Sequence, residues 1–428
     1  MSLTKDGYMP RLIDKKLEKY LKLFGAVSIE GPKWCGKTWS SLNQANTVIY
    51  LTEQSQRDLA MIDPKYIFQD KKPQLIDEWQ IVPKVWDAVR HECDNDKTKG
   101  KFILTGSTTL NSSQSEKQEV YHSGTGRIAT LRMHPMSLFE SNNSDKRASI
   151  SRMKQGKIDD GYVRKVELYE LAKYIVRGGW PGNLNVSDED LNILPKSYIE
   201  SVVKTDLHER TDRKRDSNKM MMLIKSLARN ETSIAGDATL VRDIMDFENE
   251  KEKIESRQTI SDYLKVLNDL YITANQEAYA LNYRSSKRVG KSAKRHLVDP
   301  SLACGALNLS IEKLLLDHET FGLLFEALVE RDLRIYCEYL DGKLYHFRDN
   351  ESGDEIDAII EFDDGEYAAF EIKLSDGSIE DAKRSLLNFK NHVHTKPKFM
   401  CIIVGHLEAV MVDKETGIYI VPFTSLMP

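Results

Sequence analysis

The chain has 428 residues, too many for one hydrophobic core, so its length predicts about three domains. Hydrophobic residues make up 40% and charged residues 30%, a composition typical of globular proteins that excludes a disordered or fibrous chain. The net charge of −5 argues against a protein that coats nucleic acid non-specifically, although a local basic face can be hidden in that sum. No apolar run approaches the roughly 20 residues of a membrane span and no secretory pattern opens the chain, so we expect a cytoplasmic protein without a membrane partner.

The first third of the chain alternates short apolar runs with helical or polar stretches. Residues 10–24 carry apolar side chains near helical spacing, and residues 26–29 form a short apolar run with β-branched side chains. Further short apolar runs follow at 47–51, 74–76, 102–104 and 128–133. Alternating helices and strands predict an α/β fold with a mainly parallel sheet.

Helical patterns take over in the middle of the chain, and the last part returns to mixed α and β. The helical ranges are 168–177, 196–209, 219–229 and 259–270. The last part predicts a helix at 320–333, a strand hairpin at 355–374, a helix at 379–390 and a strand at 399–404. We therefore expect three domains, which span residues 1–165, 166–305 and 306–428.

A phosphate-binding motif follows the first predicted strand. Residues 31–38 (GPKWCGKT) match the pattern GxxxxGK[ST] in the strand-to-helix context that this motif requires. Backbone N–H groups are expected to converge on phosphate oxygens, Lys37 to neutralise them and Thr38 to bind Mg²⁺, so the motif predicts ATP and Mg²⁺ as cofactors. The expected nucleotide contacts are Gly31, Pro32, Lys33, Trp34, Cys35, Gly36, Lys37, Thr38 and Trp39.

Two carboxylates end another apolar run. Residues 73–78 read PQLIDE, which places Asp77 and Glu78 at the carboxyl end of a strand. We expect Asp77 to hold the Mg²⁺ shell and Glu78 to polarise the attacking water, which predicts an ATP-hydrolysing enzyme. The alternative is an Asp-Glu pair that only caps a strand.

Two further residues are candidates for the γ-phosphate. Thr105 ends the strand at 102–104, and its hydroxyl is expected to lie between the P-loop strand and the Glu78 strand, as a sensor. Arg127 follows GTG and is expected to supply positive charge to the transferring phosphoryl group, in cis or from a neighbouring subunit. The alternatives are a plain turn threonine and a surface arginine.

The ordered set of motifs resembles a known family. The set is GPKWCGKT at 31–38, LIDEWQ at 75–80 with VP at 82–83, LTGS at 104–107, GR at 126–127, PMSLFE at 135–140, GGWP at 178–181 and FEIK at 370–373. The chain resembles prokaryotic AAA-superfamily P-loop ATPases with a C-terminal domain of unknown function related to PD-(D/E)XK nucleases. This resemblance implies an AAA-like ATPase core, a winged-helix segment and a mixed α/β, restriction-endonuclease-like C-terminal domain.

The middle segment has features of a DNA-binding module. Residues 219–229 and 257–270 have helical apolar spacing and predict a helix-turn-helix pair. Strand-like residues 271–283 and 296–299 then flank a basic loop, which carries Arg284, Lys287, Arg288, Lys291, Lys294 and Arg295. The segment 257–295 is thus a candidate to touch DNA phosphates through a wing, with core helices and a solvated charge run as the equal alternative.

The C-terminal part predicts a β-hairpin. Its two alternating strands are joined by a DDG turn, and the register places Ala358 opposite Phe370 and Asp357 opposite Glu371. Lys373 lies two residues beyond Glu371 along the same strand.

Two carboxylates and a lysine on such a hairpin suit metal-dependent phosphodiester cleavage. Asp357 and Glu371 are expected to hold the cation and Lys373 to steady the attacking water. Glu326 is expected to add a ligand, as in the nuclease relatives. The alternative is a solvated face with cross-strand ion pairs.

The sequence as a whole predicts a Mg²⁺-dependent ATPase whose nucleotide state controls a nucleic-acid-engaging winged-helix and nuclease-like module. A homo-oligomer is a candidate assembly. The rival interpretation is an ATP-switched scaffold or interaction protein whose C-terminal domain is catalytically silent.

Overall fold

The computed structural model describes residues 3–107, 124–158, 160–206, 217–247, 257–280, 292–349 and 353–428. The chain forms two compact units. The first, the P-loop unit, comprises Met1–Pro135 and the short segment Leu267–Ile272. The second comprises Met136–Val266 and Thr273–Pro428.

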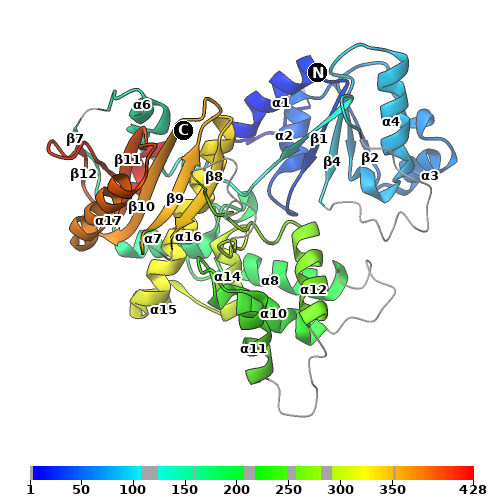
Figure 1. Ribbon diagram of the computed structural model, residues 1–428. Helices are drawn as coiled ribbons and strands as arrows, with labels where there is room; N and C mark the ends of the chain where they lie inside the picture. Colours follow the sequence, from blue (N-terminus) through cyan, green and yellow to red (C-terminus); the bar gives the residue numbers. More distant parts are fainter. Residues whose placement is uncertain are drawn as a thin grey trace. The chain divides into compact units, whose positions relative to one another are not determined.

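The P-loop unit is built on a five-stranded sheet in which every pair of neighbours is parallel. The strand order is β2 (Thr47–Tyr50), β3 (Gln74–Asp77), β4 (Phe102–Gly106), β1 (Ala26–Glu30) and β5 (Ile128–Arg132). Its helices are α1 (Leu12–Leu23), α2 (Lys37–Gln44), α3 (Gln54–Ile62) and α4 (Lys84–Asn95), and they cover both faces of the sheet (Figure 1). The predicted parallel α/β core is confirmed.

The strand order positions the expected nucleotide site. β4 pairs with both β1 and β3, so Thr105 lies between the strand that precedes the P-loop and the strand that ends in Asp77. The carboxyl ends of parallel strands meet at one edge of a sheet, where ligands of open α/β folds bind. This placement of Thr105 agrees with the expectation from the sequence.

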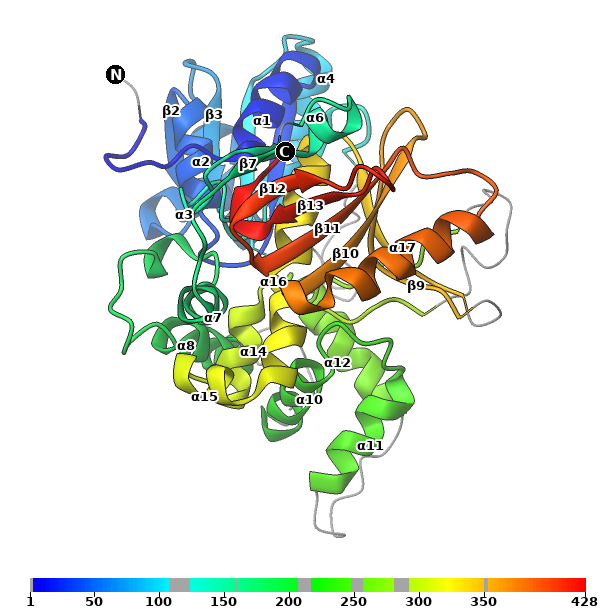
Figure 2. The same cartoon turned by 90° about the vertical axis from the view of Figure 1, so that its left-hand side faces the viewer.

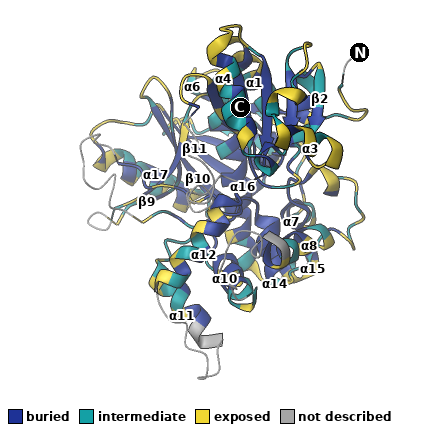
Figure 3. Cartoon of the chain, turned by 90° about the vertical axis from the view of Figure 1, so that its right-hand side faces the viewer, coloured by how far each residue is buried: buried dark blue, intermediate teal, exposed yellow. Residues whose placement is uncertain are grey.

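The second unit contains a seven-stranded mixed sheet. Its order is β7 (Gly161–Tyr162), β12 (Ala409–Val412), β13 (Tyr419–Pro422), β11 (Phe399–His406), β10 (Tyr367–Ser375), β9 (Glu355–Glu361) and β8 (Lys343–Arg348). Figure 2 shows α17 (Ile379–His392) lying along this sheet, and Figure 3 shows β10 and β11 as buried. The β9–β10 hairpin is confirmed in the predicted register, with Phe370 opposite Ala358 and Ala368 opposite Ile360.

Residues 136–165 belong to the second unit, where two short strands of this stretch pair with the end of the chain, and the expected boundary at residue 165 stays a prediction. The short strand β6 (Ala148–Ser149) pairs with β14 (Leu426–Met427), and β7 pairs with β12. Two-residue strands have no readable period-2 pattern, so the sequence could not reveal pairings with strands more than 200 residues away. The chain leaves the P-loop unit at Pro135.

The middle of the chain is helical, as predicted. Its helices are α7 (Leu168–Arg177), α8 (Ile193–Ser201), α10 (Ser217–Arg229), α11 (Asp237–Phe247), α12 (Arg257–Asp269) and α14 (Pro300–Leu307). The expected strand over 271–283 is wrong as far as residue 280, because Thr273, Gln276 and Ala278 make only isolated bridges to three different partners. Residues 281–283 lie outside the described ranges.

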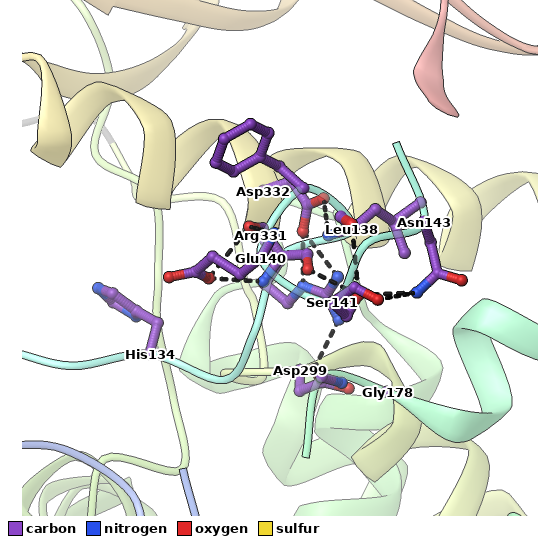
Figure 4. A network of polar contacts seen from close by, with 12 residues as sticks. His134, Leu138, Glu140, Ser141, Asn143, Gly178, Asp299, Arg331 and Asp332 are labelled. Atoms are coloured by element: carbon purple, nitrogen blue, oxygen red, sulfur yellow. Dashed lines mark hydrogen bonds and ion pairs between the residues drawn. The ribbon is translucent and has the colours of Figure 1, made fainter. Parts of the chain in front are cut away.

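A buried ion-pair network joins the middle helices to α16 (His318–Tyr339) (Figure 4). Arg331 contacts Asp299 at 2.9 Å and Asp332 at 2.6 Å, and all three side chains are buried. Asp299 also accepts the Gly179 N–H at 2.9 Å, and Asp332 accepts the Leu138 N–H at 2.8 Å. The motifs at 135–140 and 178–181 therefore supply backbone donors that satisfy buried carboxylates within this unit.

Within the part of the chain that the structure describes, no helix has both the length and the apolar character needed to cross a lipid bilayer.

Candidate functional site

The loop between β1 and α2 has the backbone of a phosphate cradle. Gly36 precedes α2 with a φ of 103°, in the left-handed region that favours glycine. A Cβ added to Gly31 would lie 2.2 Å from the carbonyl oxygen of Met133, so only glycine fits there. The two glycines of the motif are thus explained by a strained turn and a close backbone approach.

Lys37 lies inside the curve of this loop. Its side chain is buried, and its Nζ donates hydrogen bonds to the carbonyl oxygens of Gly31 at 3.0 Å and Pro32 at 2.8 Å. The ammonium group is therefore held at the inner side of the loop, where phosphate oxygens bind in P-loops.

A hydrogen-bonded chain connects the first turn of α2 with the carboxyl ends of β3 and β4. Asp77 Oδ1 accepts hydrogen bonds from Thr38 Oγ1 at 2.9 Å and from Thr105 Oγ1 at 2.6 Å. Burial raises the pKa of Asp77, and the two hydroxyl donors oppose this shift. A threonine hydroxyl beside an aspartate is the donor set by which P-loop enzymes hold Mg²⁺, so these residues fit that ion.

Glu78 is held beside this chain by Thr105 and by two residues that the sequence analysis did not assign, Ser107 and Gln80. Its backbone N–H donates to Thr105 Oγ1 at 3.2 Å, and its φ of 55° is unusual for a residue with a side chain. Its Oε2 accepts hydrogen bonds from Ser107 Oγ at 2.8 Å and from Gln80 Nε2. Ser107 is the last residue of the LTGS motif and Gln80 is the last residue of the LIDEWQ motif. Their membership of these motifs was the only indication in the sequence that the two residues belong to the site.

The other expected nucleotide contacts lie around the loop. Cys35 is buried with its Sγ facing the carbonyl oxygen of Met133, whereas Trp34 and Trp39 are exposed. Lys33 is half-buried and Pro32 is buried. Their contacts with nucleotide stay predictions.

Arg127 lies at the end of the sheet opposite the P-loop. It directly precedes β5, and its carbonyl oxygen accepts the N–H of Ala26 at the start of β1. The P-loop follows the opposite end of β1, roughly 13 Å further along a five-residue strand. The exposed Arg127 side chain pairs with Asp94 at 2.7 Å. The role of Arg127 at a phosphoryl group, in cis or from a neighbouring subunit, stays a prediction.

The C-terminal hairpin brings Asp357, Glu371 and Lys373 together. Lys373 Nζ lies 2.7 Å from Glu371 Oε2 and 3.3 Å from Asp357 Oδ2. Asp357 Oδ2 also accepts the Ile372 N–H at 2.8 Å. Burial and the nearby Asp357 raise the pKa of Glu371 to about 8, against the opposing effect of Lys373. Only the Lys373–Asp357 pair crosses between the strands, and the buried Glu371 differs from the solvated face that the alternative interpretation expected.

Glu326 pairs with a buried lysine. Lys294 is 4% exposed, and its Nζ contacts the carboxylates of Glu326 and Glu330, the latter at 2.8 Å, and the carbonyl oxygen of Asp357 at 3.3 Å. No group of three potential metal ligands occurs among the described residues. The carboxylates of Asp357 and Glu371 pair instead with Lys373. A metal ion held by Glu326, Asp357 and Glu371 stays a prediction, and it would have to compete with these two lysines.

Two members of the basic loop are unavailable to DNA phosphates. Lys294 is buried, and Arg295 pairs with Asp237 at 2.6 Å. A run of basic letters predicts a solvated or phosphate-binding face, but the sequence does not show which side chains turn inward. The remaining basic residues of the loop lie outside the described ranges, namely Arg284, Lys287, Arg288 and Lys291.

Comparisons with family models divide the chain in three. Residues 24–142 match the AAA domain model. Residues 168–313 and 321–426 match two domains of unknown function, DUF8612 and DUF4143. None of the curated proteins compared with the chain matches it.

Solved structures of ATPases resemble parts of the chain at low identity. The Walker-type ATPase PABY2304 of Pyrococcus abyssi is 15% identical with a TM-score of 0.42, over 72% of this chain and 98% of that one. The ORC2 protein of Aeropyrum pernix is 12% identical with a TM-score of 0.34, over 74% and 98%. Neither structure is used to assign a fold or a function to this chain. The AAA domain match and the P-loop geometry together identify the chain as an ATP hydrolase of the P-loop type.

Proposed function

We propose that ATP hydrolysis by this chain depends on Mg²⁺ held by Thr38 and Asp77. The carrying observation is the hydrogen-bonded chain from Thr38 through Asp77 to Thr105, which gathers a hydroxyl, a carboxylate and a second hydroxyl at the P-loop. When bound, Mg²⁺ supplies positive charge to the β- and γ-phosphate oxygens. Thr105 then senses the γ-phosphate from the neighbouring strand.

Glu78 accepts the proton of the attacking water in this proposal. Its Oε2 is fixed by Ser107 and Gln80, which orients Oε1 as the accepting atom. A base held in one orientation does not have to be reordered at the moment of reaction, which is the advantage of preorganised sites. Ser107 and Gln80 act through Glu78 and are positioning residues.

We also propose that the nucleotide state controls the segment 257–295. The P-loop unit contains Leu267–Ile272, which overlaps the end of α12. Tyr271 Oη donates to Glu30 Oε2 at 2.5 Å, and the Arg132 guanidinium lies 5.2 Å from the Tyr271 ring. Glu30 directly precedes Gly31, so a shift of the P-loop on ATP binding acts on Tyr271, two residues after the end of α12. A DNA-engaging winged helix in this segment is the partner site that we propose.

Turnover of ATP should therefore rise several-fold when duplex DNA, single-stranded DNA or RNA engages this segment. Tyr271→Phe is expected to keep the basal rate and lose most of the stimulation, because it removes the hydroxyl that contacts Glu30. Phosphate release with each nucleic acid measures both rates. Tyr169→Phe, an exposed tyrosine of the second unit, is the matched control. Failure of all three nucleic acids to bind or to change turnover would exclude this part of the proposal.

A second candidate function is an ATP-switched scaffold whose C-terminal domain, residues 306–428, cuts nothing. The buried Lys294 supports it, since its ammonium lies against the Glu326 carboxylate, one of the groups that the nuclease interpretation would offer to a cation. Under this interpretation the hairpin ion pairs are structural.

Calorimetric titration of the nucleotide-free protein with Mg²⁺ or Mn²⁺, alongside a plasmid-nicking assay, tests the scaffold. We expect no binding at millimolar cation that depends on the hairpin, and no nicking. Binding that Asp357→Asn and Glu371→Gln each remove, with nicking that Lys373→Ala abolishes, would establish a nuclease instead.

A further inference from the structure

A buried arginine outside the P-loop motif grips the outer side of the loop. Arg11 directly precedes α1 and is 7% exposed. Its Nη1 donates to the carbonyl oxygen of Cys35 at 2.7 Å, and its Nη2 donates to the carbonyl oxygen of His134 at 2.8 Å. The guanidinium fork therefore ties the P-loop to the backbone that follows β5.

The contact with Cys35 controls the direction of one P-loop N–H group. In a trans peptide the carbonyl of Cys35 and the N–H of Gly36 point in opposite directions. A donor that holds the carbonyl on the outer side of the loop therefore aims the N–H of Gly36 to the inner side, where backbone N–H groups cradle phosphate. Gly36 is conformationally permissive, so this peptide group needs an external restraint.

Arg11 is itself held in place. Its backbone N–H donates to Asp14 Oδ2 at 2.8 Å. Tyr8 Oη donates to the same carboxylate at 2.7 Å and lies 3.0 Å from Ser40 Oγ on α2, the helix that begins at the P-loop. The segment before α1 is thus fastened to the P-loop at Cys35 and to α2 at Ser40.

We propose that Arg11 is a positioning residue for the phosphate chain of ATP. It acts by orienting the Cys35–Gly36 peptide and touches no reacting atom. The inference rests on the proposed function, in which the P-loop is the ATP site. Through the Gly36 N–H, Arg11 then favours nucleotides that carry a β-phosphate over those that carry only the α-phosphate. A purely structural arginine would serve the fold without affecting which nucleotide binds.

The test compares nucleotides that differ only in phosphate number. Arg11→Gln is expected to weaken ADP and ATP binding by about 10- to 100-fold, the equivalent of one charge-assisted hydrogen bond, and to leave AMP binding nearly unchanged. Calorimetry with both nucleotides on the same protein sample gives the ratio of the ADP affinity to the AMP affinity. Any misfolded protein in the sample affects both titrations equally and therefore does not change this ratio. Arg11→Lys, which retains a donor, should lie between wild type and Arg11→Gln.

Steady-state turnover adds a second readout. The KM for ATP should rise with the loss of affinity while kcat falls much less, because Thr38, Asp77 and Glu78 are untouched. Lys22→Gln, an exposed position on α1 that pairs with Glu18, is the matched control and should change neither value.

One outcome overturns the proposal. An unchanged ADP-to-AMP affinity ratio in both Arg11 variants, whether no affinity changes or all three nucleotides lose affinity equally, would show that the arginine only stabilises the fold. Lys37→Ala separates this failure from a wrong P-loop assignment, since its loss of ATP binding confirms the site whatever Arg11 does.

Discussion

Replacing Glu78 with glutamine is expected to lower ATP turnover by about 10²- to 10⁴-fold while ATP still binds. The amide is close in size to the carboxylate but accepts no proton from water. Ser107 and the glutamine side chain can still hydrogen-bond, so the cradle and the Thr38–Asp77–Thr105 chain stay in place. Single-turnover hydrolysis and nucleotide binding, measured on the same protein, separate the two effects.

Lys37→Ala is the matched comparison for Glu78→Gln. Loss of the buried ammonium removes phosphate neutralisation, so both binding and turnover should be lost. Glu18→Gln, an exposed carboxylate on α1, should behave as wild type. Turnover that survives in purified Lys37→Ala protein would refute the nucleotide site, and undiminished turnover in Glu78→Gln would refute only the base.

Replacing Lys294 with methionine is expected to destabilise the second unit by about 3–5 kcal/mol at pH 8, because it leaves buried carboxylates without their cation. Burial raises the pKa of Glu326 to about 8 and that of Glu330 to about 7. A carboxyl whose folded pKa is raised contributes its stability below its unfolded pKa, and that contribution is lost as pH rises through the folded pKa. The defect should therefore be small near pH 5 and large near pH 8.

Denaturant unfolding of wild type and Lys294→Met at both pH values measures this difference. Adding Glu326→Gln and Glu330→Gln to the methionine variant should recover much of the loss at pH 8. Lys343→Met, on an exposed part of β8, is the control. Equal destabilisation at pH 5 and pH 8 would mean that Lys294 stabilises the second unit by packing and not by its charge. Millimolar Mn²⁺ should stabilise Lys294→Met alone if the lysine stands in place of a cation.

The nucleotide site could be predicted where its chemistry is local in sequence. The P-loop follows β1 without interruption, and Asp77 and Glu78 end β3, so a motif and a strand pattern were enough to place them at one sheet edge. Thr105 was placed correctly because a parallel sheet leaves few positions between two such strands.

Residues that act through backbone atoms of a distant segment could not be predicted. Arg11 reaches the carbonyl of Cys35 across 24 positions and that of His134 across 123. No residue type or spacing marks such a contact, because any backbone carbonyl can accept it. Ser107 and Gln80 were overlooked for a related reason. The sequence shows that a motif contains a hydroxyl or an amide, but not which carboxylate accepts its hydrogen bond.

Sequence interpretation was least informative where a charged side chain is buried and not exposed to solvent. Lys294 belongs to a basic run, which normally indicates solvent or phosphate, yet it is enclosed by acidic side chains contributed by α16. Glu326 was proposed as a metal ligand from the resemblance to nuclease relatives, which says nothing of a lysine beside it. Only the fold shows that the two neutralise each other.

The split composition of the P-loop unit has a practical consequence for protein expression. A recombinant fragment that stops at Pro135 omits Leu267–Ile272 and with it the tyrosine partner of Glu30. A complete unit requires those six residues to be restored, either as a co-expressed peptide or by a flexible linker that rejoins them to Pro135. A single cut at Pro135 therefore separates the P-loop unit from six of its own residues.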